Sequence, residues 1–463
     1  MSVVISKIAN PRGTADILPN QISAWTFLEA TSRSLFGVYG YKEIRTPVFE
    51  ESGLFKRSLG ETTEVVNKQL LEVSSSRSSV NSHNAPNMIE PGVVEDAGLA
   101  LRPEGTAAVV RAYNQFDIGR NEYLSKLFYI GPMFRGERPQ KGRLRQFHQI
   151  GAEVIGRGAN NPLLDAEIIA LAVNLLKSFG VEGFKVRINS LGTAEDKAGF
   201  AIWLREALKD KIAGLSHDCQ VQYERNVFRL LDSKDAACRS VIASLNIGTR
   251  HLSESGLKYF ESVKAGLDQL GVVYEVSPEL VRGLDYYTHT VFEMIFAGLG
   301  AQDAIGAGGR YNGLIEQLGG RQPDGQKTEG ATAYTGAIGF ALGMERILLA
   351  LEHLKKPLVG TPELEAFVIT GSAEFEARAF QLVNALRAAG ISADMDFGSR
   401  AFKKQFEQAN KLGARYALIL GDEEIRNGQV AVKNMQSGEQ RTVPLDQVVG
   451  QWENEKKVII NQR

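Results

Sequence analysis

The spacing of hydrophobic positions changes along the chain, and it predicts where helices and strands lie. Residues 21–39 and 163–179 repeat apolar side chains at helical spacing, so each stretch predicts a helix with a buried face. Residues 41–50 predict a strand, which Pro47 places at a sheet edge or at a break. Between residues 101 and 157, short apolar runs alternate with turns rich in Gly, Pro and Arg. This alternation is typical of an antiparallel sheet.

The second half of the chain continues with helical and then strand-like patterns. Residues 193–267 predict a largely helical stretch without a recognisable motif, as an insertion would have. Residues 272–296 and 301–314 return to strands and glycine turns, and residues 336–353 predict a strand that leads into a helix. The Pro- and Gly-containing stretch 355–362 is typical of a linker.

Beyond that linker the pattern becomes a regular alternation of short strands and helices. The predicted strands are 366–370, 391–395, 416–420 and 429–433, and the predicted helices surround residues 379–386 and 402–412. Such alternation favours a small, mostly parallel α/β domain over residues 361–463. A larger domain then covers residues 1–360, with the helical insertion at about 190–260. The serine-rich stretch 74–98 predicts a mobile loop.

The composition is that of an ordinary globular protein. Hydrophobic residues make up 43% of the chain and charged residues 23%, which excludes global disorder. The 53 Lys and Arg nearly balance the 54 Asp and Glu, so any nucleic-acid surface has to be local. No apolar run approaches the roughly 18 residues of a membrane span, and the first residues are too weakly apolar for a signal peptide. Two cysteines favour a reducing compartment. We expect a soluble, cytoplasmic protein without a membrane partner.

Several common motifs are absent from the sequence. It has no Gly-x-x-x-x-Gly-Lys-Ser/Thr loop and no dinucleotide fingerprint, and the glycines of 306–311 better fit a tight strand entry. His217, Cys219 and Cys238 lack the paired spacing of a metal site, so ordinary core or surface roles are favoured for them. The sequence therefore predicts no metal site built by protein ligands.

Three arginines stand out because each follows or lies within an apolar, structured segment. Arg135 ends an apolar run, Arg282 follows another, and Arg346 lies early in the last helix of the large domain. Burial of an unpaired arginine costs several kcal/mol, so each needs a partner. One alternative is a separate ion pair for each, with local acids such as Asp285 or Glu345. The other is a shared nucleotide polyphosphate, which guanidinium groups bind bidentately.

Acidic and amide side chains supply a possible second half of a site. Glu104 and Thr106 flank a glycine that lets a ligand approach the backbone. Gln149 and Glu153 share one face if their segment is a strand. That face is either solvated, as is common in antiparallel sheets, or suited to a small cationic ligand with an ammonium or imidazole group. Spacing alone leaves both alternatives open.

At the level of motifs, the chain resembles the histidyl-tRNA synthetase family of class II aminoacyl-tRNA synthetases, essentially from end to end. Residues 11–19 are similar to the N-terminal signature of the family, and residues 44–47, 134–149 and 339–346 resemble class motifs 1, 2 and 3. Arg282-Gly-Leu-Asp-Tyr-Tyr287 and Ala307-Gly-Gly-Arg-Tyr311 resemble segments specific to the histidyl family. Two departures are the long 74–98 stretch and Asn312, where the family commonly has Asp.

The resemblance implies an α+β fold: a class II antiparallel sheet flanked by helices, a helical insertion and a C-terminal α/β anticodon-binding domain. It implies a histidine–tRNA ligase that forms histidyl-adenylate and pyrophosphate from histidine and ATP and then charges the 3′ end of tRNA. ATP with Mg²⁺ is expected as a substrate complex, with no tightly bound cofactor, and the partners are histidine, ATP, the tRNA and a second copy in a homodimer. The alternatives are a catalytically inactive regulatory paralogue, which binds histidine or a partner enzyme, and a nucleic-acid-binding protein without activity.

The resemblance also implies roles for the cations. Arg135 would hold the α-phosphate of ATP and Arg346 the far end of the triphosphate. Arg282 would act beside the α-phosphate as a second catalytic cation. The motif 2 loop, including Gln140 and Arg143, would meet the acceptor end of the tRNA.

The same resemblance implies a histidine site. Glu104, Thr106 and Gln149 would receive the α-ammonium group of the amino acid. Glu153 and Tyr287 would bracket the imidazole, with Tyr286 lining the pocket. An analogue without the imidazole would leave those buried polar groups unpaired, which is an effective basis for discrimination.

Overall fold

A computed structural model describes residues 8–61, 63–73, 98–120, 122–300, 303–320, 335–356, 364–450 and 452. The chain divides into two compact units, Met1–Leu358 and Val359–Arg463. The predicted mobile loop at 74–98 lies outside the described residues except for Gly98, and the predicted linker at 355–362 lies outside them beyond residue 356. Within the described part of the chain, no helix is both long and apolar enough to cross a bilayer.

The first unit is built on an eight-stranded sheet in the order β1-β5-β6-β11-β10-β9-β7-β8. All neighbours pair antiparallel except β1–β5 and β7–β8. The predicted antiparallel sheet is therefore confirmed. Its strands are β1 (Lys42–Glu43), β5 (Leu124–Phe134), β6 (Gln146–Gly156), β7 (Lys185–Ser190), β8 (Glu275–Val276), β9 (Thr288–Ile295), β10 (Ala304–Arg310) and β11 (Gly336–Gly343).

Two predictions about this region need correction. The single strand expected at 41–50 is broken: β1 forms the sheet edge, Pro47 lies in the break, and β2 (Phe49–Glu51) joins a second small sheet with β4 (Leu99–Leu101) and β3 (Glu72–Val73). Residues 106–115, expected within the antiparallel sheet, form helix α3 (Thr106–Gln115). Its first turns contain a short apolar run at 107–110, and such a run does not by itself distinguish a buried strand from a helix.

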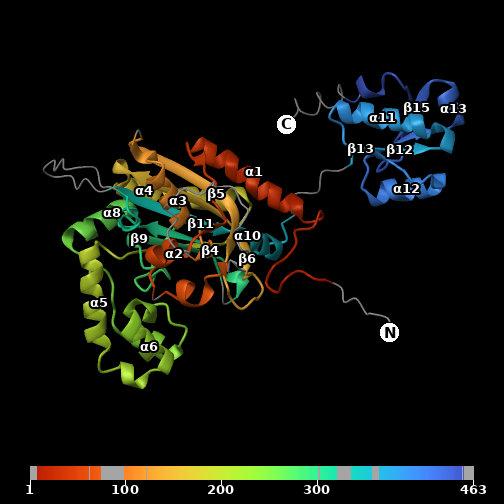
Figure 1. The fold of residues 1–463 in the computed structure, drawn as a ribbon. Helices are drawn as coiled ribbons and strands as arrows, with labels where there is room; N and C mark the ends of the chain where they lie inside the picture. The colour runs from red at the N-terminus through yellow and green to blue at the C-terminus, as the bar shows by residue number, and fades with distance from the viewer. Residues whose placement is uncertain are drawn as a thin grey trace, which may run out of the picture. The chain divides into compact units, whose positions relative to one another are not determined.

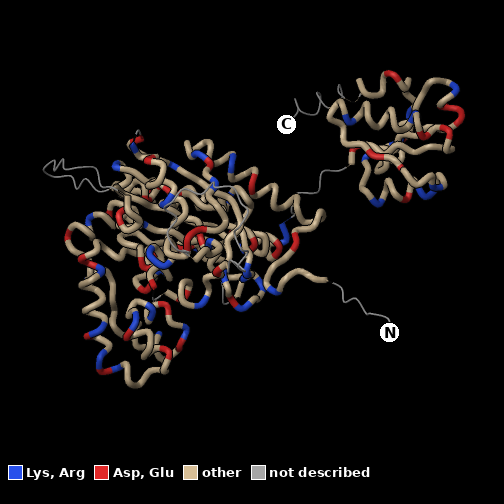
Figure 2. The backbone as a smooth tube through the Cα atoms, in the orientation of Figure 1, with Lys and Arg blue, Asp and Glu red and all other residues tan. Residues whose placement is uncertain are grey.

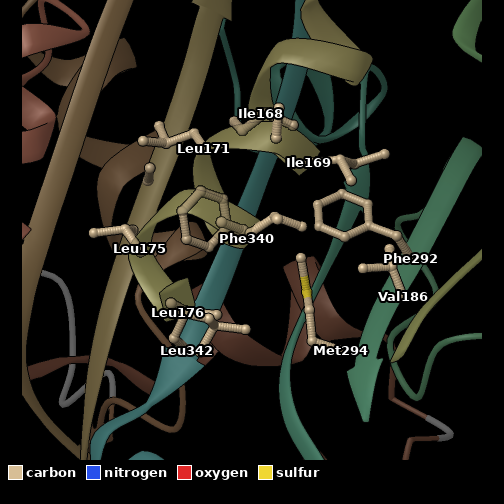
Figure 3. Packing of buried hydrophobic residues seen from close by; sticks show 14 of the residues in the cluster. Ile168, Ile169, Leu171, Leu175, Leu176, Val186, Phe292, Met294, Phe340 and Leu342 are labelled. Carbon is tan, nitrogen blue, oxygen red and sulfur yellow. The ribbon is translucent and has the colours of Figure 1, made fainter. Parts of the chain in front are cut away.

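Helices cover the sheet and bury its apolar face. The N-terminal part of α4 is stabilised by Asn161, whose side chain accepts a hydrogen bond from the Leu163 N–H group, and by Pro162 at the first helical position. Figure 3 shows the α4 side chains packed against Phe340 and Phe292 of the sheet. Truncating such a buried Leu to Ala costs about 2–5 kcal/mol. The helices outside the insertion are α1 (Ile22–Val38), α2 (Ser52–Leu59), α3, α4 (Pro162–Ser178), α9 (Leu314–Gln317) and α10 (Met344–His353).

The stretch between β7 and β8 is largely helical, as predicted, and comprises α5 (Ala194–Leu208), α6 (His217–Arg225), α7 (Ala236–Ser244) and α8 (Glu254–Gln269). In the ribbon, α5 and α6 lie to one side of the central sheet (Figure 1). Thr193 and Asp196 form a capping box at the start of α5. Buried side chains of α5, with Cys219 and Cys238, give the insertion an apolar interior, and both thiols are free.

Short helical turns connect many of these elements. A π-helical turn covers Val65–Gln69, and single 3₁₀ turns cover Ile118–Arg120, Arg157–Ala159, Ile212–Gly214, Val227–Leu230, Ala297–Leu299 and Ala373–Phe375. The turn at 227–230 connects α6 to α7 and is capped by Asn226, whose side chain accepts from the Phe228 N–H group. The Asn226 amide also donates a hydrogen bond to Asp285.

The second unit has its own five-stranded sheet in the order β13-β12-β14-β15-β16. Its three parallel strands are followed by two antiparallel ones, so the expectation of a mostly parallel sheet was wrong for the second half. The predicted buried face of α11 is confirmed. The elements are β12 (Ala366–Thr370), α11 (Glu376–Ala388), β13 (Ala393–Met395), α12 (Phe402–Lys411), β14 (Tyr416–Leu420), α13 (Asp422–Arg426), β15 (Gln429–Asn434) and β16 (Gln440–Pro444).

Candidate active site

A cavity of about 440 Å³ opens in the first unit, where β6, β7, β9, β10 and β11 meet the segment between β8 and β9. It collects side chains from segments that lie more than 200 residues apart in the sequence. Of the predicted site residues, Glu104, Thr106, Arg135, Arg143, Gln149, Arg282, Tyr286, Tyr287 and Arg346 line this cavity. Glu153 and Gln140 are not in its lining.

Arg135 follows β5 directly and is held from two sides. Its Nε donates to the Pro103 carbonyl at 2.9 Å, and its guanidinium lies 5.2 Å from the centre of the Phe147 ring. Burial lowers the pKa of the Arg135 guanidinium, and Glu104 opposes that shift. Because only Nε is used in the hydrogen bond to Pro103, the other N–H donors of Arg135 are available to a ligand in the cavity.

Arg282 lies in the irregular segment between β8 and β9. Its Nη1 forms an ion pair with Oε1 of Glu293 on β9 at 3.0 Å. Burial opposes the charge of Arg282, but Glu293 and the neighbouring tyrosines outweigh burial and raise its pKa. The buried Nε of Arg282 has no hydrogen-bond partner, so the side chain still offers a donor to a ligand.

Arg346 is positioned by backbone groups and not by a carboxylate. Its Nε donates to the Gly142 carbonyl at 3.1 Å and its Nη1 to the Ala304 carbonyl at 2.6 Å. Burial lowers the pKa of Arg346, and the positive charges of Arg143 and Arg135 lower it further. Mutual repulsion among cations in one cavity is a feature that a bound polyanion relieves.

The sequence-based alternative, in which each arginine pairs with a nearby acid, fails for the acids it named. Glu345 is occupied by His148, accepting from its backbone N–H group at 2.9 Å and contacting its ring Nδ1 at 2.9 Å. Asp285 accepts a hydrogen bond from Asn226 at 3.0 Å. Only Arg282 has a carboxylate ion-pair partner among the three arginines in the described residues, and that partner is the sequence-distant Glu293.

The motif 2 loop divides between the cavity and the surface. Arg143 lines the cavity and pairs with Glu137, which is itself buried. Gln140 is exposed and pairs with Arg143 only through a backbone β-bridge. Lys and Arg are interspersed with Asp and Glu over the described chain (Figure 2), and the cavity lining likewise holds both arginines and acidic residues.

Glu104 sits at the beginning of α3. Its two carboxylate oxygens accept the backbone N–H groups of Thr106 and Ala107 at 2.7 and 2.8 Å. Burial raises the pKa of Glu104, and these two hydrogen bonds oppose the rise. The carboxylate thus binds two N–H groups of the first helical turn that have no partner within the helix, and it still lines the cavity.

Gln149 and Thr106 complete a set of oxygen acceptors near Glu104. The Oε1 atom of Gln149 is buried and has no hydrogen-bond partner. The Thr106 hydroxyl donates to Oε1 of Glu153 at 2.7 Å, which leaves its own lone pairs free to accept. An unpaired buried carbonyl oxygen costs about 1–3 kcal/mol, and a donor from a ligand would remove that cost.

Glu153 lies behind the cavity wall at the centre of a hydroxyl network. It is fully buried and accepts from Thr106 and from the Tyr311 hydroxyl at 2.5 Å, with the Tyr129 hydroxyl at 3.4 Å. Desolvation raises the pKa of Glu153 to about 8, although the hydroxyl donors oppose the rise. Gly339 pairs with Glu153 across β6 and β11, and a Cβ there would collide with the carboxylate. The absence of a side chain at 339 makes room for the acid.

Four tyrosines surround this acid. The rings of Tyr286 and Tyr287 lie 4.5 Å apart, and Tyr286 contacts Tyr311 at 5.7 Å. A Cβ at Gly309 would lie 2.8 Å from the Tyr287 ring, so the glycines of β10 let that ring approach the sheet. Burial raises the pKa of each hydroxyl, and at neutral pH all four are neutral donors.

Sequence reasoning did not select several of these residues. Tyr129 and Glu293 lie in ordinary-looking strands, and Tyr311 was noted only as part of the family-specific glycine segment. The alternation of β6 was the one usable signal, because it put Gln149 and Glu153 on one face. A strand neighbour such as Tyr129 becomes visible only when β5 and β6 are paired.

Asn312, which departs from the family pattern, and Cys219, considered as a metal ligand, both form ordinary polar contacts. Asn312 accepts from the Ala337 N–H group at 2.9 Å and from Arg310 at 3.0 Å, and its amide donates to Asn160 at 2.9 Å. Cys219 contacts the hydroxyl groups of Ser216 and Ser233 within the insertion. Among the described residues, no group of three or more His, Cys, Asp and Glu side chains has the arrangement of a metal site.

Comparison with known proteins agrees with this geometry. The family model for histidyl-tRNA synthetase matches residues 13–347, and that for the anticodon-binding domain matches residues 365–455. A histidine–tRNA ligase of Halothermothrix orenii is 41% identical over 442 residues, covering 95% of this chain and 97% of that protein. One from Desulforamulus reducens is 42% identical over 441 residues, with 95% and 97% covered.

A solved structure gives the same result in three dimensions. The apo histidyl-tRNA synthetase of Staphylococcus aureus is 36% identical, with a TM-score of 0.75, and the match covers 96% of this chain and 99% of that one. The mixed central sheet and the separate C-terminal sheet are those of a class II aminoacyl-tRNA synthetase. Within that class, the chain belongs to the histidyl-tRNA synthetase family.

Proposed function

We propose that this protein is a histidine–tRNA ligase and that its cavity is where ATP activates histidine. Family membership supports the activity, as does sequence identity of 41–42% to histidine–tRNA ligases over 95% of this chain. The single observation that supports the site is that Arg135, Arg282 and Arg346 line the same cavity as Glu104 and Gln149. A triphosphate and an amino acid would therefore lie side by side.

In the first step, a carboxylate oxygen of histidine attacks the α-phosphorus of ATP. A new phosphorus–oxygen bond forms, the bond to the bridging oxygen breaks, and pyrophosphate leaves with that electron pair. Negative charge increases on the non-bridging oxygens, where Arg135 and Arg282 would stabilise it. Both side chains are already held by the protein, so little reorganisation accompanies the reaction.

ATP would also be oriented by the third arginine of the cavity. Arg346 would hold the far end of the triphosphate, and its repulsion from neighbouring cations would be relieved by the bound anion. Mg²⁺ would enter as part of the ATP complex, because this ion is held mainly by substrate phosphates and water at such sites. No tightly bound cofactor is required by this chemistry.

The ammonium group of histidine would be received by three oxygen acceptors. Glu104 supplies a carboxylate, Gln149 an unpaired carbonyl oxygen, and Thr106 a hydroxyl whose proton is committed to Glu153. An ammonium group has three donors and no acceptor, so three converging acceptors match it. Holding the amino acid here would direct its carboxylate toward the arginines.

The imidazole would be read by Glu153 and Tyr287, with Tyr286 lining the pocket. Glu153 is held by hydroxyl donors and has a raised pKa of about 8, so an added imidazole donor would favour its charged form. Apolar amino acids of similar size lack this donor and would leave the network unpaired. Selection for histidine would then rest on buried polar groups and not on pocket size.

In the second step, a hydroxyl group of the terminal tRNA ribose attacks the carbonyl carbon of histidyl-adenylate, and AMP leaves. Gln140 and Arg143 of the motif 2 loop would meet the acceptor end of the tRNA. Gln140 is exposed for such a contact, and Arg143 reaches the cavity. The second unit, which matches an anticodon-binding model, would supply a further tRNA contact.

We further propose a cytoplasmic homodimer. Val48, Phe49, Val73 and Leu99 expose apolar side chains on the small three-stranded sheet, next to the motif 1 segment 44–47. A second copy could cover that surface. The two free, buried cysteines fit a reducing compartment.

The decisive experiment is ATP–pyrophosphate exchange measured with and without histidine. We expect exchange that depends on histidine and needs no tRNA. A regulatory paralogue or a simple nucleic-acid-binding protein would show no such exchange. Loss of exchange in Arg282→Ala, with the circular-dichroism spectrum unchanged, would tie the activity to this cavity.

A further inference from the structure

The segment from Arg282 to Tyr287 has irregular backbone, although it carries side chains at both ends of the cavity. It connects β8 to β9 and has no strand partner of its own. Buried carbonyl groups outside regular structure need donors from elsewhere. In this protein those donors come from the helical insertion.

Lys197 on α5 supplies two of these contacts. Its Nζ donates to the Asp285 carbonyl at 2.7 Å and to the Tyr287 carbonyl at 2.9 Å. Burial lowers the pKa of Lys197, and Asp285 opposes the shift. One ammonium group thus fixes two carbonyls that lie two residues apart, directly beside a predicted imidazole-binding side chain.

Two more side chains of the insertion hold the same segment. Arg229 donates from Nη2 to the Gly283 carbonyl at 2.6 Å, next to Arg282 in the chain. Asn226 donates from Nδ2 to Oδ1 of Asp285 at 3.0 Å. A cavity of about 260 Å³ is lined by these residues together with Arg282 and Asp285. These polar contacts therefore connect the insertion to the segment that carries Arg282 and Tyr287.

We propose that Lys197, Asn226 and Arg229 are positioning residues for histidine activation, because they fix the backbone that carries Arg282 and Tyr287. This inference rests on the proposed function. It adds a role for the helical insertion in adenylate formation, a step that involves no tRNA. None of the three side chains needs to touch a substrate for this role.

Lys197→Met is the first test, because methionine has similar length but cannot donate a hydrogen bond. We expect the rate constant of histidyl-adenylate formation, measured by histidine-dependent exchange, to fall about 10- to 100-fold, as for small displacements of reacting groups. The KM for ATP should change much less than kcat. Lys197→Arg keeps a charged donor and should recover most of the rate.

A matched control is Lys209→Met. Lys209 follows the same helix, is largely exposed, and lies 3.9 Å from Glu206. It should leave the exchange rate within twofold of wild type. Active sites are counted in every variant by the burst of adenylate formed per subunit, so that a folding defect lowers the burst amplitude while a positioning defect lowers the rate of the burst.

Asn226→Asp is an independent test that spares the local helix cap. The carboxylate still accepts the Phe228 N–H group, but it now faces Asp285 and repels it. We expect a slower burst with full amplitude. Unchanged burst rates in both Lys197→Met and Asn226→Asp would overturn the positioning role. Absence of histidine-dependent exchange in the wild-type protein would instead overturn the proposed function.

Discussion

The ionisable side chains at the two ends of the cavity differ in how burial affects their charge. At one end, Arg135, Arg282 and Arg346 are held mainly by backbone carbonyls and one carboxylate, so positive charge remains in excess. Behind the wall of the other end, Glu153 is enclosed by hydroxyl groups, and burial raises its pKa to about 8. One end is charged at every working pH, and the other titrates close to neutrality.

This difference follows from the chemistry of the side chains. A guanidinium group keeps its charge when buried, because its pKa remains far above neutral even after a downward shift. A carboxyl group responds to the same burial by taking up a proton. The arginine end therefore suits a polyphosphate of fixed charge, while the acidic end suits a ligand that donates hydrogen bonds.

Removing a fixed cation should have the largest effect. In Arg282→Ala we expect the rate of adenylate formation to fall about 10²- to 10³-fold, as for the loss of one preorganised stabilising donor. Stopped-flow or exchange kinetics would measure this. Arg33→Ala, which removes a surface arginine paired with Glu29, is the control and should leave the rate unchanged. Equal rates in wild type and Arg282→Ala would contradict the role of this end.

At the acidic end, Glu153→Gln keeps size and removes the ability to become charged. We expect kcat/KM for histidine to fall about 10- to 100-fold, since a ligand donor loses its best acceptor. The KM for ATP should stay within a factor of about two. Similar losses for both substrates would show that the two ends do not act separately.

The pH dependence of stability tests the raised pKa of Glu153 without substrates. The pKa of Glu153 is raised from 4.5 to about 8, so the folded protein binds one more proton than the unfolded chain between these values. The contribution of the Glu153 carboxyl group to the free energy of unfolding is therefore complete below about pH 4.5. It decreases as the pH rises to about 8, by at most about 1.4 kcal/mol per pH unit. Urea unfolding of wild type and Glu153→Gln at several pH values would isolate it. Parallel profiles would argue against the raised pKa.

Removal of the second unit should have the smallest effect on the cavity. A chain ending at residue 358 retains the sheet, both ends of the cavity and the insertion. We expect adenylate formation within about twofold of wild type, because compact units usually fold independently. The KM for tRNA should rise at least about tenfold, a loss of about 1.4 kcal/mol of binding. Charging of tRNA with unchanged kinetics would argue against a tRNA contact by this unit.

Much of the fold was predictable because its elements have clear one-sided patterns. The helix at 163–179 and the buried face of α11 were found from spacing alone, and the structure confirms both. Helix α3 was missed although Arg111, Asn114 and Gln115 form a polar side, because its short apolar run was interpreted together with the strand-like runs around it. Strand β16 was missed for the opposite reason: Gln440, Arg441 and Thr442 are exposed and give no apolar signal.

The candidate site was predictable only as separate fragments. Spacing put Gln149 and Glu153 on one face of β6, and motif resemblance selected the arginines. Neither could reveal that Glu293 is the ion-pair partner of Arg282, since that contact depends on the path of the chain between β8 and β9. The structure brings most of the selected residues to one cavity, while their individual roles stay predictions.

The position of the Tyr129 ring depends on two glycines that leave room for it. Tyr129 lies between Gly105 and Gly151, and a Cβ at either glycine would come within 2.3 or 2.2 Å of the ring. The Tyr129 hydroxyl contacts Glu153, so a side chain at residue 105 or 151 would disturb the hydroxyl network around that acid. The surroundings of Glu153 are thus encoded in part at two positions that carry no functional group, and an engineer seeking to alter them could begin there.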